Sequence, residues 1–124
     1  MPYVTDWIRS IRMRHYRIEI TDLAEKDLEN AADYIAFELK NSIAAKNTVK
    51  GIRKQINSLV NFPERNELDE DEFLAEIGVR TDYYRNYKIY YIIMDDTIYI
   101  VRILHMLVNS RAWLYRTFGM DVNE

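Results

Sequence analysis

The 124-residue chain is predicted to fold as one α+β domain in which a two-helix hairpin is followed by a group of strands. Two apolar stripes at helical spacing follow each other between residues 22 and 60 with only Asn41-Ser42 between them. Residues 87–105 form two β-type runs separated by Asp95-Asp96, the pattern of a β-hairpin. The predicted order of elements is β-α-α-β-β-β-α.

The first two elements are a strand and a helix. Residues 16–20 alternate apolar and charged side chains, which predicts a half-buried strand. Asp22, with Glu25 three residues later, indicates the N-terminus of a helix that runs to about Lys40. Its apolar stripe comprises Ala24, Leu28, Ala31, Ala32, Ile35 and Leu39.

A second helix follows at once. Asn41-Ser42 can cap it, and Phe62-Pro63 ends it because proline cannot continue the hydrogen-bond ladder. Its apolar stripe comprises Ala45, Val49, Ile52, Ile56, Leu59 and Val60. Two helices joined by so short a connection should pack antiparallel as a helical hairpin.

The second half of the chain is predicted to be mostly strand. The acidic stretch 64–76 has no clear period and is interpreted as a surface loop. Gly78 then opens a strand-like segment to Arg85, and the hairpin 87–105 follows. Asn109-Ser110 can cap a short final helix from Arg111 to Phe118, with Gly119 as its C-terminal stop.

The single domain is therefore assigned to residues 16–118, with residues 1–15 as an N-terminal extension and residues 119–124 as a tail. Helical spacing in the extension is compatible with an amphipathic turn or two packed on the domain. The alternative is that Met13 is the natural start. The residues with that spacing are Val4, Trp7, Ile8 and Ile11.

Composition excludes several classes of function. The chain has no cysteine, so disulfides, thiolate metal sites and a thiol nucleophile are absent. Its two histidines, His15 and His105, show no metal-ligand spacing, and its three glycines form no phosphate-binding loop, so neither metal nor cofactor is expected. No apolar run reaches the roughly 18 residues of a membrane span, and a cytoplasmic location is expected.

Charge is distributed unevenly despite a net charge of only −3. Residues 64–76 contain seven acidic side chains and one arginine, whereas the charged side chains of residues 78–117 are mainly basic. Lys88, Arg102 and His105 stand within otherwise apolar strands, where an unpaired charge is costly. They should either line a face that is open to a ligand or be paired, and a buried pair with Asp27 or Asp33 is the simpler interpretation of Arg102.

The order and spacing of these elements, from Tyr16 to Phe118, resemble the RelE/ParE superfamily of toxins from bacterial type II toxin-antitoxin systems. The resemblance rests on short motifs distributed along every predicted element. They are Tyr16-Arg17-Ile18, Ala24, Asp27, Leu28, Asp33-Tyr34-Ile35, Ala45, Ile52, Ile56, Leu59, Phe62-Pro63, Gly78-Val79-Arg80, Asn86-Tyr87-Lys88-Ile89-Tyr90-Tyr91 and Val101-Arg102-Ile103-Leu104-His105.

The resemblance implies a twisted, mainly antiparallel sheet with the helical hairpin on one face and a groove on the other. It also implies an antitoxin whose C-terminal segment wraps the toxin. One branch of the superfamily cleaves messenger RNA on the ribosome, whereas the other poisons DNA gyrase without known nuclease chemistry. In both branches, the toxin-antitoxin complex binds the DNA of its own operon, so the toxin meets DNA only indirectly. A third alternative for this chain is an inactive relic that only binds antitoxin.

Cleavage of RNA requires a proton acceptor, a donor for the leaving oxygen and cations. The resemblance places Lys88 in a nuclease motif, and a regular ladder around a two-residue turn would pair residue 86 with His105, putting Lys88 and His105 on one face. Arg80, Arg111 and Tyr115 would complete a cationic groove, so an endoribonuclease is the preferred mechanism.

Each of these candidates also has a structural alternative. His105 could be satisfied by a backbone carbonyl, Arg80 could pair with the acidic loop or Asp82, and Tyr115 could simply pack on the sheet. Arg111 lies in the first turn of a helix, where a cation opposes the dipole, and this favours an external anion. Nuclease members usually end the last strand in a basic or His/Tyr cluster, whereas Met106-Leu107-Val108 follows here.

Overall fold

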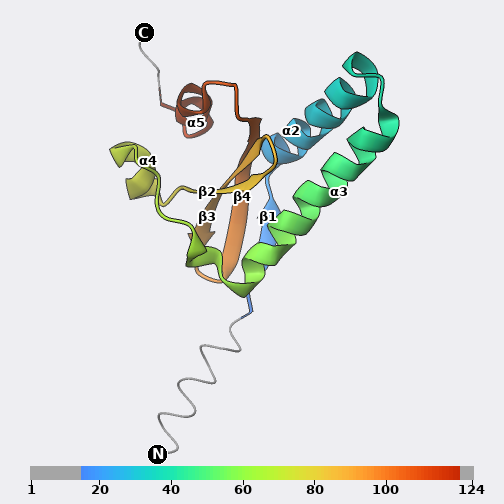
Figure 1. The fold of residues 1–124 in the computed structure, drawn as a ribbon. Coiled ribbons are helices and arrows are strands. Elements are labelled where there is room, and N and C mark those ends of the chain that lie inside the picture. Colours follow the sequence, from blue (N-terminus) through green and yellow to red (C-terminus); the bar gives the residue numbers. More distant parts are fainter. Residues whose placement is uncertain (1–14, 121–124) are drawn as a thin grey trace, which may run out of the picture.

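The computed structural model describes residues 15–120, and the expectations for residues 1–14 and 121–124 lie outside that part of the chain. Four strands form one sheet in the order β1-β4-β3-β2 (Figure 1). β1 pairs in parallel with β4, and the other neighbours are antiparallel, as predicted. The strands are β1 (Arg17–Ile20), β2 (Arg80–Tyr84), β3 (Tyr87–Met94) and β4 (Thr97–His105).

The predicted helical hairpin covers one face of this sheet. It consists of α2 (Asp22–Asp33), which continues as the π-helical turn η1 (Tyr34–Glu38), and α3 (Ser42–Ser58), which ends in the 3-10 turn η2 (Leu59–Asn61). Asn41 caps α3 as predicted, because its side chain accepts from the backbone N–H of Ala44 at 2.9 Å. The other cap was wrong by one residue: Thr21, not Asp22, has extended backbone angles, and its hydroxyl accepts from the N–H of Ala24.

Apolar side chains from the hairpin and the sheet form the larger core cluster. Its members have at most 3% of their surface exposed, and five of the twelve stripe positions predicted on the two helices are among them. Partly buried side chains from β1 pack against it. The cluster consists of Ala24, Leu28, Ile52, Ile56, Leu59, Ile89, Tyr91, Ile98, Ile100 and Ile103.

The opposite face of the sheet is also covered, by α4 (Glu72–Ile77) and α5 (Ser110–Thr117) (Figure 1). The prediction of a surface loop over residues 64–76 was therefore wrong for residues 72–76, which lie in α4. Asp71 caps α4, Gly78 ends it with a left-handed φ of 100°, and the short turn η3 (Pro63–Arg65) precedes it. Gly78 thus closes a helix and does not open a strand.

A second core cluster lies beneath these two helices. It includes Leu74 of α4 and Leu114 of α5, each with 1% of its surface exposed, packed on Tyr90, Ile92 and Leu104 of the sheet. This face is consequently closed by the protein's own helices over much of its area. Among the helices of the described part, none is both long and apolar enough to cross a membrane.

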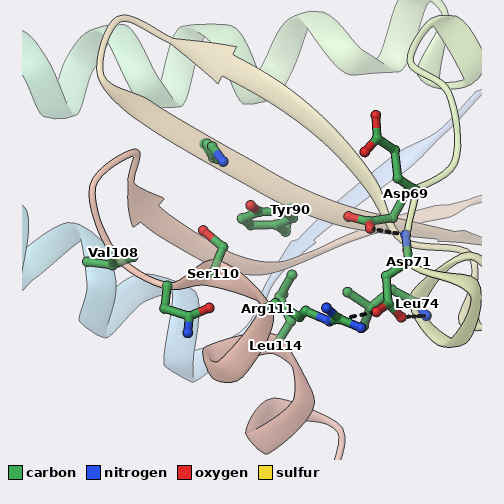
Figure 2. A pocket seen from close by; sticks show the side chains of 11 residues that line it. Asp69, Asp71, Leu74, Tyr90, Val108, Ser110, Arg111 and Leu114 are labelled. Atoms are coloured by element: carbon green, nitrogen blue, oxygen red, sulfur yellow. Dashed lines mark hydrogen bonds and ion pairs between the residues drawn. The ribbon is translucent and has the colours of Figure 1, made fainter.

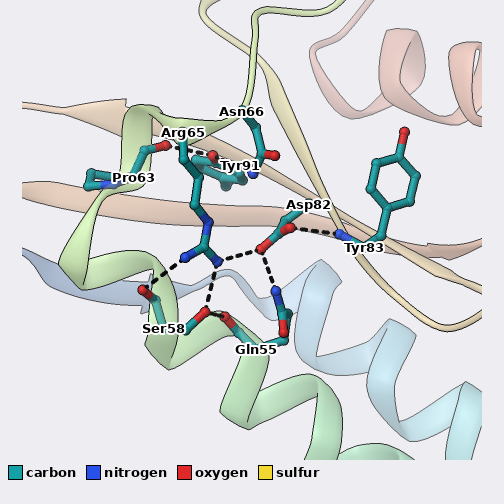
Figure 3. Close-up of polar contacts among 8 residues, drawn as sticks. All are labelled: Gln55, Ser58, Pro63, Arg65, Asn66, Asp82, Tyr83 and Tyr91. Atoms are coloured by element: carbon teal, nitrogen blue, oxygen red, sulfur yellow. Dashed lines mark hydrogen bonds and ion pairs between the residues drawn. The ribbon is translucent and has the colours of Figure 1, made fainter.

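A polar network ties the end of α3 to β2 (Figure 3). The Asp82 carboxylate, which is largely buried, accepts from Gln55 Nε2 at 2.9 Å and from Arg65 Nη2 at 2.9 Å. Nearby, the hydroxyl of the fully buried Tyr91 donates to the carbonyl of Pro63 at 2.6 Å. The cation that pairs with Asp82 is thus Arg65, whereas Arg80 had been considered for that role.

Acidification should test this network. Burial alone would raise the pKa of Asp82, but the hydrogen bonds from Gln55 and Arg65 outweigh it and lower the pKa. A lowered folded-state pKa stabilises the fold above the unfolded value of about 3.9, and this contribution disappears as the pH falls through the folded-state value. We expect wild type to lose more unfolding free energy than Asp82→Asn between pH 5 and pH 2, measured by urea denaturation. Parallel curves for the two proteins would contradict the assignment.

Candidate functional site

The pairing of β3 with β4 decides which predicted site residues meet. The turn at Asp95-Asp96 has two residues, as predicted, and Met94 pairs with Thr97. A β-bulge then interrupts the ladder, since Tyr91 pairs with Ile100 whereas Tyr90 pairs with Arg102, leaving Val101 as an extra residue. Beyond the bulge every pair is displaced by one residue from a regular ladder.

This displacement separates Lys88 from His105. Lys88 is paired with Leu104, and His105 is paired with Tyr87. Because successive side chains alternate between the faces of a strand, Lys88 and His105 project to opposite faces of the sheet. The expectation that they share a face was wrong, and its physical cause is the one residue that the bulge adds to β4.

A polar pocket of about 540 Å³ lies between β3, the start of α5 and the acidic segment that precedes α4 (Figure 2). Lys88 and Arg111 both line it, so the structure brings these two predicted residues to one site. Three carboxylates, those of Asp69, Glu70 and Asp71, line the same pocket. By formal charge the pocket is therefore not cationic, which differs from the expected groove.

Asp71 is the most highly coordinated of these carboxylates. It accepts from Arg111 Nε at 2.8 Å, from the Tyr115 hydroxyl at 2.8 and 3.0 Å, and from the backbone N–H of Leu74 at 3.1 Å. Desolvation opposes ionisation, but the hydrogen bonds from Leu74 and Tyr115 and the Arg111 cation together lower the pKa of Asp71. Arg111 and Tyr115 are thus joined through an internal counter-ion, and the external anion that the helix position of Arg111 favoured is not required.

Tyr115 combines the two interpretations made from the sequence. Its ring packs edge-on against Phe73 of α4, with 5.2 Å between the ring centroids, and its hydroxyl is held by Asp71. The Lys88 side chain, by contrast, makes no hydrogen bond or ion pair with any residue in the range 15–120. Its ammonium group is the pocket's available cation.

His105 lies on the other face, at the end of β4. Its Nδ1 accepts from the backbone N–H of Leu107 at 3.1 Å, and its ring meets Tyr87 edge-on at 5.3 Å between centroids. The backbone therefore does satisfy this histidine, through an N–H and not through the carbonyl that was considered. Its bond shapes the turn that follows β4.

Arg80 and Arg102, which also lie in the sheet, have structural partners. Arg80 is paired with Tyr91, well along β3 from Lys88, and its guanidinium donates to the carbonyl of Asn66. Arg102 forms the predicted buried ion pair with Asp27, Nη2 to Oδ1 at 2.7 Å and Nε to Oδ2 at 2.8 Å. Neither arginine lines the polar pocket.

Comparison with known proteins identifies the family. A family model described as the ParE toxin of the type II toxin-antitoxin system parDE matches residues 18–107. The chain belongs to this ParE toxin family. A comparison with curated protein sequences found no match.

Solved structures show the fold of this ParE-family chain. It is similar to a structure described as the chromosomal ParDE toxin-antitoxin system from P. aeruginosa, with a TM-score of 0.64 and 21% identity over 74% of this chain and 97% of that one. It is also similar to the RelBE2 toxin-antitoxin complex from Mycobacterium tuberculosis, with a TM-score of 0.54 and 22% identity over 73% and 98% of the two chains. The predicted superfamily and fold are confirmed.

Sequence reasoning missed an apolar groove of about 600 Å³ between α2 and α5 of this ParE-family toxin. Leu23, Tyr34, Leu107 and Trp113 line it, together with residues 102–105 at the end of β4, and Leu107 has 86% of its surface exposed. A contiguous exposed apolar surface of this kind is typical of a protein-binding site. The run Met106-Leu107-Val108, noted only as a departure from nucleases, was the available signal.

Proposed function

We propose that this toxin inhibits growth by binding a protein target, DNA gyrase in the ParE branch, and not by cleaving messenger RNA. The observation that carries the proposal is the displaced register of β3 and β4, which separates Lys88 and His105 by the thickness of the sheet. General acid-base catalysis requires both groups within hydrogen-bond reach of one phosphodiester. The five candidate residues therefore do not form a single catalytic site.

Electrostatics supports the same proposal. A phosphodiester that entered the polar pocket would meet Asp69, Glu70 and Asp71 as well as Lys88 and Arg111. At the few ångströms that separate groups in such a pocket, each uncompensated repulsion costs on the order of 1 kcal/mol or more. The two cations would therefore add little to the binding free energy of a nucleic acid in this pocket.

RNA cleavage is kept as the second candidate because of one observation. Lys88 and Arg111 share the polar pocket, and the Lys88 ammonium makes no bond within the described residues. A nuclease site built on these two cations would use neither His105 nor Arg80. It would also require Asp71 to release Arg111.

A cognate antitoxin is the proposed inhibitory partner, and the apolar groove between α2 and α5 is its proposed binding surface. An amphipathic helix that places apolar side chains against Leu107 and Trp113 would cover the surface that this groove exposes. Trp113 lines this groove, and because the chain also contains Trp7, a fluorescence change that is lost in Trp113→Phe would report on binding there.

The double variant Lys88→Ala/His105→Ala separates the two candidates. We expect its expression to arrest bacterial growth to within about twofold of wild type, because inhibition by binding needs no pair of acid-base groups. The measurements are growth after induction, supercoiling by purified gyrase with added toxin, and mapping of messenger 5′ ends. Loss of toxicity together with loss of codon-spaced cuts made by wild type would refute the proposal.

A further inference from the structure

The carboxylate of Asp71 occupies a position at which an external anion would be well bound. A guanidinium nitrogen, a phenolic hydroxyl and a backbone N–H converge on it from α5 and from the first turn of α4. Charged and hydroxyl donors of this kind are typical ligands of a phosphate or carboxylate oxygen. Lys88 lines the same pocket and adds a second cation.

The carboxylate is fixed in place by the core. Asp69 Oδ1 accepts from the N–H of Asp71 at 2.8 Å, which holds the turn before α4, and Leu74 buries the helix against the sheet. Asp71 keeps only 9% of its side chain exposed, whereas the Arg111 side chain that contacts it is 71% exposed. Asp71 is therefore the fixed partner of this pair. Arg111 becomes free to bind another anion once the charge of Asp71 is removed.

We propose that Asp71 is a built-in competitor which occupies the anion-binding donors of this pocket and keeps nucleic acid away from Lys88, Arg111 and Tyr115. This inference deepens the proposed function, because it explains how a toxin with cations on its sheet face avoids binding RNA. Asp71 thus acts as a residue that determines specificity, through Arg111 and Tyr115. It has no catalytic role.

The substitution Asp71→Asn tests the inference with little risk to the fold. Asparagine caps helices as well as aspartate does and can still accept from Leu74, but it no longer neutralises Arg111. The probe is a fluorescein-labelled single-stranded RNA of about 12 nucleotides, followed by fluorescence anisotropy. We expect roughly three- to thirtyfold tighter binding than wild type at about 50 mM salt, because a repulsive charge is removed and a cation is released.

The salt dependence distinguishes a new phosphate contact from a general change in charge. One additional contact should steepen the slope of log affinity against log salt by about 0.7 for a single strand. Asp95→Asn, an exposed acid-to-amide change in the β3–β4 turn, is the matched control and should leave both quantities near wild type. Adding Arg111→Gln to Asp71→Asn should abolish the gain.

Equal binding by the Asp71 and Asp95 variants would overturn the inference, as would a gain that persists without Arg111. Circular dichroism and thermal melting establish that each variant is folded before it is compared. Cleavage of the RNA by wild type, read on the same samples by gel, would instead count against the proposed function. The two failures are therefore distinguishable.

Discussion

Replacing Arg102 by alanine is expected to lower the free energy of unfolding by about 3–5 kcal/mol, because it leaves a buried carboxylate without its cation. Asp27 accepts two hydrogen bonds from Arg102, and both side chains are more than 90% buried. The substitution also removes a bond from Arg102 to Thr117 and a cation–π contact with Trp113 at 5.1 Å. The pair thus joins α2, β4 and α5, and urea denaturation measures its loss.

Arg53→Ala is the matched control. Arg53 also makes two hydrogen bonds to one carboxylate, that of Glu25, but these two side chains are 44% and 46% exposed. Exposed pairs contribute about 0–1 kcal/mol, so the control should remain near wild type. Similar losses of unfolding free energy in the Arg102 and Arg53 variants would show that burial does not determine the cost of breaking an ion pair. Replacing both Arg102 and Asp27 by apolar residues should recover part of the stability.

A buried pair of Arg102 with Asp27 or Asp33 was predictable from the sequence, and the structure shows that the partner is Asp27. A charge within an apolar strand needs a partner, and Asp27 stands beside Leu28 in the stripe of the first helix. The helical hairpin and the β3–β4 hairpin were predictable for a similar reason. Each hairpin consists of two long apolar patterns separated by a short polar break, and such patterns indicate local structure directly.

The bulge at Val101 could not be predicted in the same way. Val101 lies in a run of mainly β-favouring residues, and no glycine or proline marks the extra residue. A regular ladder was therefore the natural assumption, and it placed Lys88 and His105 on the wrong relative faces. A single unpaired residue reverses the face of every side chain beyond it, so site geometry is more sensitive to such a feature than the fold is.

The helix α4 escaped prediction because six residues are too few to establish a helical period. The sequence did contain signals for both ends of this helix, a capping residue at Asp71 and a terminating glycine at Gly78. The acidic composition of the segment nevertheless indicated a solvent-exposed loop. Missing this helix also affected the prediction of the site. Carboxylates that were expected to lie in a surface loop are brought into the polar pocket, where Asp71 neutralises Arg111.

Leu74→Ala should show how strongly that segment is held. Leu74 has 1% of its surface exposed in the second core cluster, so truncation should cost about 2–5 kcal/mol through lost burial and a cavity. We expect faster hydrogen exchange at the amides of Gly78 and Val79, which donate to the carbonyl of Leu74. Leu68→Ala, at a position 46% exposed in the same segment, should cost less than about 1 kcal/mol. If the two leucines behaved alike, α4 would not be anchored to the sheet by its apolar face, and the fixed position of Asp71 would lose its physical basis.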